Sequence, residues 1–91
     1  MFLSWLFGDG KNKPLGKVVH YFDKIQVAVI RLEGVLKVGD KVKIVRGDHE
    51  FTETVGSMQV DHKDIMNAGK GEEVAIKVNE PTKDGALVYK V

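Results

Sequence analysis

Short runs of alternating hydrophobic and polar residues follow one another along most of this chain. From Leu15 onward each run ends near glycine, proline, asparagine or aspartate, and no segment repeats hydrophobic residues at helical spacing over a long window. The strongest run lies between Gly34 and Val45 and reads G-V-L-K-V-G-D-K-V-K-I-V. Its hydrophobic residues share one parity and its lysines share the other, and Gly39 and Asp40 favour a turn between the two halves. The chain is therefore predicted to be all-β.

The spacing of these runs predicts six antiparallel strands, at residues 15–22, 25–33, 41–46, 51–60, 73–79 and 87–91. Gly56 lies within the fourth run and predicts a bulge or a close backbone approach. Residues 61–71 form a connection with room for one helical turn around 64–67. A closed barrel is favoured because closure removes exposed strand edges, and a two-sheet sandwich is the alternative.

Length and composition limit the chain to one small domain. It has 91 residues, of which 43% are hydrophobic and 30% charged, and its net charge is +1. This balance is typical of a folded soluble domain. Cysteine is absent, which fits a reducing cytoplasm and leaves no disulfide or thiolate metal site. We expect a segment and linker at residues 1–14 and one β-domain at residues 15–91.

The first residues, M-F-L-S-W-L-F-G, form an apolar cluster that the β-pattern does not explain. The cluster is far shorter than the roughly 20 residues of a membrane-spanning helix. It also lacks the basic start and the small-residue cleavage site of a secretory signal. Three interpretations stay open: packing on the domain, an anchor that uses Phe2, Trp5 and Phe7 to bind a partner or a membrane surface, or a frayed end.

Residues that carry chemistry are sparse. No glycine-rich loop ends in Lys and Ser or Thr, so the chain alone is not expected to bind GTP. His20, His49 and His62 lack the spacing and the cysteine partners of a metal site. Asp48, His49 and Glu50 are predicted to lie in a solvated turn beside no nucleophile. The sequence therefore predicts no enzyme activity, no metal and no cofactor.

The order of the motifs resembles domain 2 of the translational GTPases, the β-barrel that follows the nucleotide domain in elongation factor Tu and initiation factor two. Stand-alone elongation factor-like proteins, which consist of this barrel alone, look closer still. The resemblance covers residues 15–91 and is carried by residues 32–45, 55–60, 68–76 and Asp84-Gly85. It implies a six-stranded antiparallel Greek-key closed barrel.

The resemblance also implies a binding surface at one end of the barrel, where the family receives the aminoacyl end of tRNA. The matching positions in this chain are Asp23, Lys24, Ala28, Gln59, Asp61, His62 and Lys63. Tyr21, Phe22 and Lys24 are a candidate RNA-facing set, although a core Phe22 beside a rim Tyr21 is the favoured interpretation. The chain lacks the Gly-Arg-Gly loop, the threonine and the glutamate that the family has at Phe22-Asp23-Lys24, Ala28 and Gln59.

Two functions are predicted on this basis. The first is a non-catalytic, cytoplasmic binding module that docks onto tRNA, ribosomal RNA, a ribosome or a translation-related protein. The second is a protein-interaction subunit that uses the apolar N-terminal residues and has no nucleic-acid role. The sequence names no partner and no oligomeric state.

Overall fold

A computed structural model describes residues 13–91 of the chain. It contains ten strands: β1 (Gly16–Phe22), β2 (Val27–Leu32), β3 (Leu36–Lys37), β4 (Lys41–Arg46), β5 (His49–Thr54), β6 (Met58–Val60), β7 (Lys63–Ile65), β8 (Asn67–Ala68), β9 (Glu73–Lys77) and β10 (Leu87–Lys90). All the strand pairs that these residues form are antiparallel. The all-β class predicted from the alternating pattern is confirmed.

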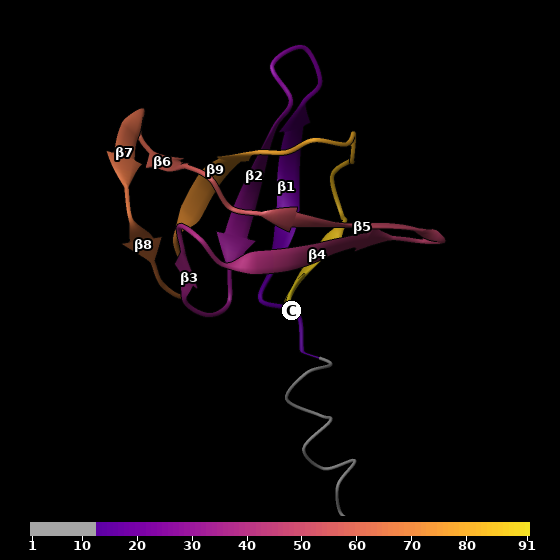
Figure 1. Cartoon of the computed structure of the whole chain (residues 1–91), viewed down its shortest axis with the longest axis horizontal. Helices are drawn as coiled ribbons and strands as arrows, with labels where there is room; N and C mark the ends of the chain where they lie inside the picture. The colour runs from indigo at the N-terminus through magenta and orange to yellow at the C-terminus, as the bar shows by residue number, and fades with distance from the viewer. Residues whose placement is uncertain (1–12) are drawn as a thin grey trace, which may run out of the picture.

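Eight of the strands form one sheet in the order β5-β4-β10-β1-β2-β9-β6-β7, and β3 pairs with β8 in a second, two-stranded sheet. Figure 1 shows how the large sheet curves around its interior, with the β4–β5 hairpin crossing in front of β1 and β2. The terminal strands of the order, β5 and β7, do not pair with each other. The prediction of six strands in a closed barrel is therefore wrong, although the strands are antiparallel as expected.

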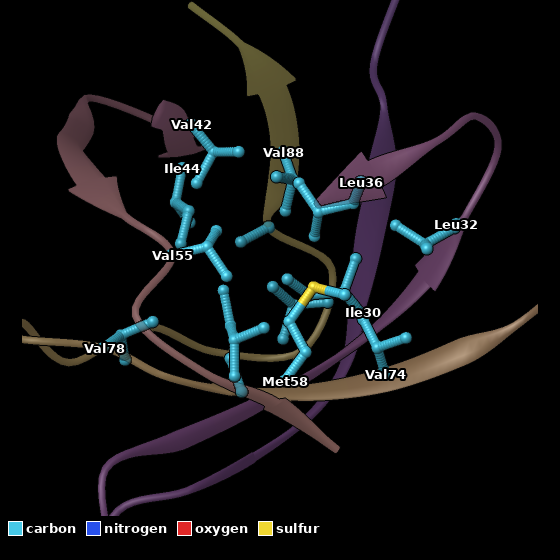
Figure 2. Packing of buried hydrophobic residues seen from close by; sticks show 14 of the residues in the cluster. Ile30, Leu32, Leu36, Val42, Ile44, Val55, Met58, Val74, Val78 and Val88 are labelled. Atoms are coloured by element: carbon cyan, nitrogen blue, oxygen red, sulfur yellow. The ribbon is translucent and has the colours of Figure 1, made fainter. Parts of the chain in front are cut away.

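The interior is formed by one face of each long strand. Figure 2 shows ten of its side chains converging from the surrounding strands: Ile30, Leu32, Leu36, Val42, Ile44, Val55, Met58, Val74, Val78 and Val88 are each at most 1% exposed. Each such aliphatic side chain contributes about 1.5–3 kcal/mol when it leaves water. This apolar interior holds the curved sheet together.

Gly16 begins β1 at a point where the chain has no room for a side chain. A Cβ atom at this position would lie 2.7 Å from the Arg31 carbonyl oxygen and 2.7 Å from Ile30 Cγ2. Both contacts come from β2, which pairs with β1 through Gly16 and Leu32. The close packing of β1 on β2 therefore requires glycine here.

The predicted strand at residues 51–60 is divided in two. Residues 55–57 interrupt it between β5 and β6, and Gly56 lies in this break rather than in a bulge. Phe51, Glu53 and Val55 face inward before the break, and Met58 faces inward after it. The interruption changes the parity of the inward positions, which a single alternating strand does not allow.

The connection predicted to hold a helical turn is extended instead. Residues 63–65 form β7 and residues 67–68 form β8, so the chain passes from the edge of the large sheet into the small one. Val38 N–H donates to the Met66 carbonyl oxygen at 2.9 Å and so ties the turn after β3 to the bend between the two strands. Backbone pairing to distant strands outweighs the weak helical preference of so short a segment.

Candidate functional site

The residues predicted to form a binding end are divided between two distant turns. Asp23 and Lys24 lie in the four-residue turn between β1 and β2, which Gln26 closes with φ of 55°. Ala28 pairs with Tyr21 at the start of β2 and is completely buried, so its side chain contacts only the core. This part of the predicted site offers two charged side chains and a tyrosine.

The remaining predicted residues belong to the β6–β7 hairpin. Asp61 and His62 form its two-residue turn with φ of 52° and 66°, the type I′ geometry that fits the twist of a hairpin. Gln59 and Lys63 flank the turn, and Gln59 Nε2 donates to Asp64 Oδ1 at 2.9 Å. The side chain of Gln59 is thus already engaged within its own hairpin.

The register of β9 explains why these two turns do not meet. Val27, next to the first turn, pairs with Lys77 at the end of β9, whereas Gln59 pairs with Ala75 and β6 continues toward the start of β9. Figure 1 shows the β1–β2 turn and the β6–β7 hairpin at separate extremities of the molecule. The structure therefore does not bring the predicted binding residues together.

Two further predictions concern aromatic residues. Phe22 is 45% exposed, and its ring meets that of His20 at 4.2 Å between centroids, so the expectation of a core Phe22 is wrong. Tyr21 is half-buried and packs against the core. The reversal follows from the irregularity between Val18 and His20 in β1, which shifts the inward parity of the strand. Phe2, Trp5 and Phe7 lie outside the described residues.

A hollow at the end of β1 gathers charged residues that are far apart in the sequence. We call it the Arg46 hollow; its volume is about 560 Å³, and it is lined by Tyr21, Asp23, Arg46, Pro81, Thr82, Lys83 and Asp84. β1 supplies Tyr21, the β1–β2 turn supplies Asp23, and Arg46 ends β4 immediately before the Gly47-Asp48 turn. Residues 81–84 come from the connection between β9 and β10.

Two polar contacts hold this connection against β5. Asn79 N–H donates to Glu53 Oε1 at 2.8 Å, and Asn79 Nδ2 donates to Glu53 Oε2 at 3.1 Å. Glu53 is only 8% exposed, so both of its oxygens are used within the protein. The more exposed His49 Nε2 lies 3.6 Å from Glu80 Oε1. Together these contacts fix where residues 81–84 stand relative to Arg46.

The charged groups of the Arg46 hollow do not neutralise one another. Within residues 13–91, Arg46, Lys83, Asp23 and Asp84 form no ion pair with one another or with other groups. All four are exposed. A surface that offers guanidinium, ammonium and carboxylate groups together suits a ligand that carries both charges.

Thr82 gives the hollow an unusual buried polar atom. The residue is 6% exposed, and its Oγ1 has no hydrogen-bond partner among the described residues. Leaving a buried hydroxyl without a partner costs about 1–3 kcal/mol. Nothing local in the sequence predicts that Arg46, Lys83 and Thr82 meet, because the turn residues Pro81, Asp84 and Gly85 indicate only a loop.

Two arrangements that are common in hydrolytic enzymes are absent among the described residues. Residues 13–91 contain no group of three or more His, Cys, Asp or Glu side chains placed to hold a metal ion. In the same part of the chain no histidine is hydrogen-bonded to a serine or threonine hydroxyl. A nucleophile with an adjacent base is the minimum for covalent hydrolysis.

Comparison with known proteins places the chain beside peptidase-related proteins. No protein-family model matches it. It is 41% identical over 76 residues to a protein of Methanocaldococcus jannaschii described as the uncharacterized protease MJ0090. The matched part is 82% of this chain and 19% of that protein, so the chain spans about a fifth of the length of this relative.

Two solved structures share the fold. Both are of the C-terminal domain of a putative U32 peptidase from Geobacillus thermoleovorans, one of them its selenomethionine variant. Their TM-scores are 0.82 and 0.83, with 18% sequence identity in each case. The match covers 87% and 89% of this chain and 100% and 94% of the two domains. At this identity the likeness is one of fold.

These comparisons overturn the resemblance to translation factors. The relatives are a protease and a peptidase domain, so the prediction of a translation-factor module that binds RNA or a ribosome is wrong. The comparisons also give no support to the alternative, an interaction subunit that docks through the apolar N-terminal residues. The binding roles given to Asp23, Lys24, Gln59 and their neighbours therefore lose their basis.

Two of the motifs that suggested a translation-factor barrel form tight turns in this structure, and the turns explain their residues. Asp40 Oδ2 accepts the Lys37 N–H at 2.9 Å, and Gly39 has φ of 98°. Glu72 Oε1 accepts the Gly69 N–H at 2.8 Å, and Gly71 has φ of 91°. Both motifs satisfy backbone groups at tight turns, which a β-fold requires whatever it binds. These motifs therefore indicate a β-fold with tight turns and do not indicate a function.

Residues 13–91 contain no helix that is long and apolar enough to cross a membrane.

Proposed function

We propose that this chain is a non-catalytic polypeptide-binding domain that works as part of, or beside, a U32-type peptidase. The observation that supports this most is the 41% identity to a segment of a protein described as a protease, in a chain whose fold matches a peptidase C-terminal domain. The matched segment is a small fraction of the relative. A fraction of this size suits an accessory domain, which leaves the catalytic groups to the rest of such a protein.

The chemistry of the described residues supports a binding role over a catalytic one. A hydrolase needs an activated nucleophile or a metal-bound water, together with a group that shuttles protons. The Arg46 hollow instead presents separated charges of both signs beside Tyr21. Peptides carry both charges at their termini and offer backbone donors and acceptors between them, so a peptide end is the ligand class that matches these groups.

A paired assay tests the two parts of the proposal. The purified chain is incubated with denatured casein and with short peptides, and the release of new amino termini is followed. We expect no hydrolysis above that of buffer. Turnover that survives further purification and depends on a residue of this chain would show that the domain is catalytic.

Binding is measured by two-dimensional NMR on the same sample, with short peptides that have free termini and with their acetylated and amidated counterparts. We expect shifts centred on Tyr21, Arg46 and residues 81–84 for the free peptides. The Arg46→Ala variant should bind about tenfold or more weakly, since a hydrogen bond to a charged group contributes about 1.5–3 kcal/mol. Lys77→Ala, at an exposed lysine of β9, is the matched control. Equal losses in both variants would contradict a specific site.

A cytoplasmic location, expected from the cysteine-free composition, remains part of this proposal, and fractionation of the native host tests it.

A further inference from the structure

The outward face of β10, β4 and β5 carries a second hollow that the proposed function does not use. We call it the Tyr89 groove; its volume is about 740 Å³, and it is lined by Lys43, Val45, Glu50, Thr52, Tyr89, Lys90 and Val91. The pairing of β10 with β4 and of β4 with β5 places these side chains in two rows that run across the three strands. Leu87 pairs with Val45 and Val45 with Glu50, while Tyr89 pairs with Lys43 and Lys43 with Thr52.

Apolar side chains on this face are left without a partner element among residues 13–91. Leu87, Val45 and Tyr89 are half-buried, and Val91 is 69% exposed. They alternate with Val88, Val42 and Ile44, which are buried in the core, so their side chains point to the opposite side of the sheet. A contiguous apolar strip on a sheet face is a surface at which another segment docks.

The chain itself supplies a segment of matching chemistry. Residues 2–7 read F-L-S-W-L-F and contain five large apolar side chains in six positions. The described chain enters the domain at the edge of this same strip, since Leu15 N–H donates to the Val88 carbonyl oxygen of β10 at 2.6 Å. Leu15 also packs against the core and so fixes the point from which the preceding residues leave.

The chain between residues 2–7 and the domain is long enough for these residues to reach the Tyr89 groove. An extended chain covers about 3.3 Å per residue, so the six steps along the chain from Lys13 back to Phe7 span up to roughly 20 Å. The distance from β10 across β4 to β5 is about 10 Å, because neighbouring strands lie about 4.8 Å apart. The linker between them, D-G-K-N-K-P, is polar and rich in residues that break regular structure. Residues 2–7 can therefore reach any part of the groove.

We propose that residues 2–7 dock on the Tyr89 groove of their own domain and cover its apolar strip. The docked segment removes two apolar surfaces from water at once, and the short tether raises their effective concentration far above that of a separate partner. This inference does not depend on the proposed peptide-binding function.

Trp5 makes the docking directly measurable, because it is the single tryptophan of the chain. In the 91-residue chain we expect a blue-shifted emission maximum and acrylamide quenching several-fold weaker than for free tryptophan. Val45→Lys places a charge in the centre of the groove, and it should return both values to those of a solvated tryptophan. Ile25→Lys is the matched control, since Ile25 is 60% exposed in the distant β1–β2 turn, and it should leave both unchanged.

Two further measurements keep the test decisive. Nuclear Overhauser contacts between the Trp5 indole and the methyl groups of Val45 or Leu87 in the unmodified chain should be present, which covers the case of a variant that fails to fold. The emission maximum should stay constant on dilution. A solvated Trp5, a blue shift that survives Val45→Lys in a folded variant, or a shift that disappears on dilution would each overturn docking within one chain, and the last would indicate a second copy as the occupant.

Discussion

Two regions of this domain are held together by different physics. Along β1, β2 and β9, neighbouring strands are joined by long antiparallel ladders, and inward residues such as Val18, Ile30 and Val74 are fully buried. Between β5 and the residues that follow β9 there is no ladder among the described residues, and the Glu53 carboxylate bridges the gap to Asn79. The first region, the ladder region, consists of neighbouring strands of one sheet with an apolar inner face. In the second region, the fastened region, polar side chains make the contacts across the gap, and the hydrogen bonds come from Glu53.

The two regions differ in which polar groups remain without a partner and are therefore available to a ligand. In the ladder region the backbone groups are paired between strands, and one face of each strand is buried in the core. The fastened region leaves hydroxyl and charged groups without partners, and the Arg46 hollow lies there. A carboxylate that spans a gap holds the connection in place while leaving room beside it, which a continuous ladder would fill.

The largest loss of stability is expected for a substitution in the ladder region. Ile30→Ala should lower the free energy of unfolding by about 2–5 kcal/mol, since it removes a fully buried side chain and leaves a cavity between β1 and β9. Urea denaturation followed by circular dichroism measures the loss. Val35→Ala, at a side chain that is 52% exposed, should change stability by less than about 0.5 kcal/mol. Similar losses in the two variants would contradict the assignment of the core.

A smaller loss of stability is expected when the hydrogen bonds between Glu53 and Asn79 are removed. Glu53→Ala leaves the Asn79 N–H and Nδ2 without their acceptors, and stability should fall by about 1–3 kcal/mol. Hydrogen exchange at the Asn79 amide should speed up more than exchange at the β2 amides, because the connection loosens first. Glu50→Ala, at an exposed position of the same strand, serves as the control. If Asn79 stays as protected as before, Glu53 does not fasten the connection.

The smallest change is expected at Thr82, where a substitution should raise the stability. Thr82→Val replaces an unpaired buried hydroxyl with a methyl group of similar shape, so stability should rise by up to about 1 kcal/mol. Thr82→Ser keeps the hydroxyl and loses only the methyl group, and it should be less stable than the wild type. Thermal unfolding of the three proteins gives the comparison. A destabilised Thr82→Val would mean that the hydroxyl has a hydrogen-bond partner in solution.

The sequence predicted well wherever a local pattern had only one interpretation. Val42 and Ile44 in β4, and Val74, Ile76 and Val78 in and after β9, face the core as their alternation indicates. It failed at residues 51–60, which form two strands, because a glycine within an apolar run is compatible with a bulge in one strand as well as with a break between two. The sequence also did not predict that the candidate binding residues lie in two separate turns, because their grouping assumed a barrel end that the register of β9 does not form.

The sequence by itself determined the β class, the turns and the inward face of the strands that alternate cleanly, because these depend on residues next to one another in the chain. Only the tertiary structure decided that Leu87 and Tyr89 face outward while Val88 faces the core, since all three are apolar and nothing local distinguishes the sides of β10. It also decided the fastening of Glu53 to Asn79, which are 26 positions apart, and the meeting of Arg46 with residues 81–84. Such contacts depend on how the sheet curves, which is a property of the whole chain.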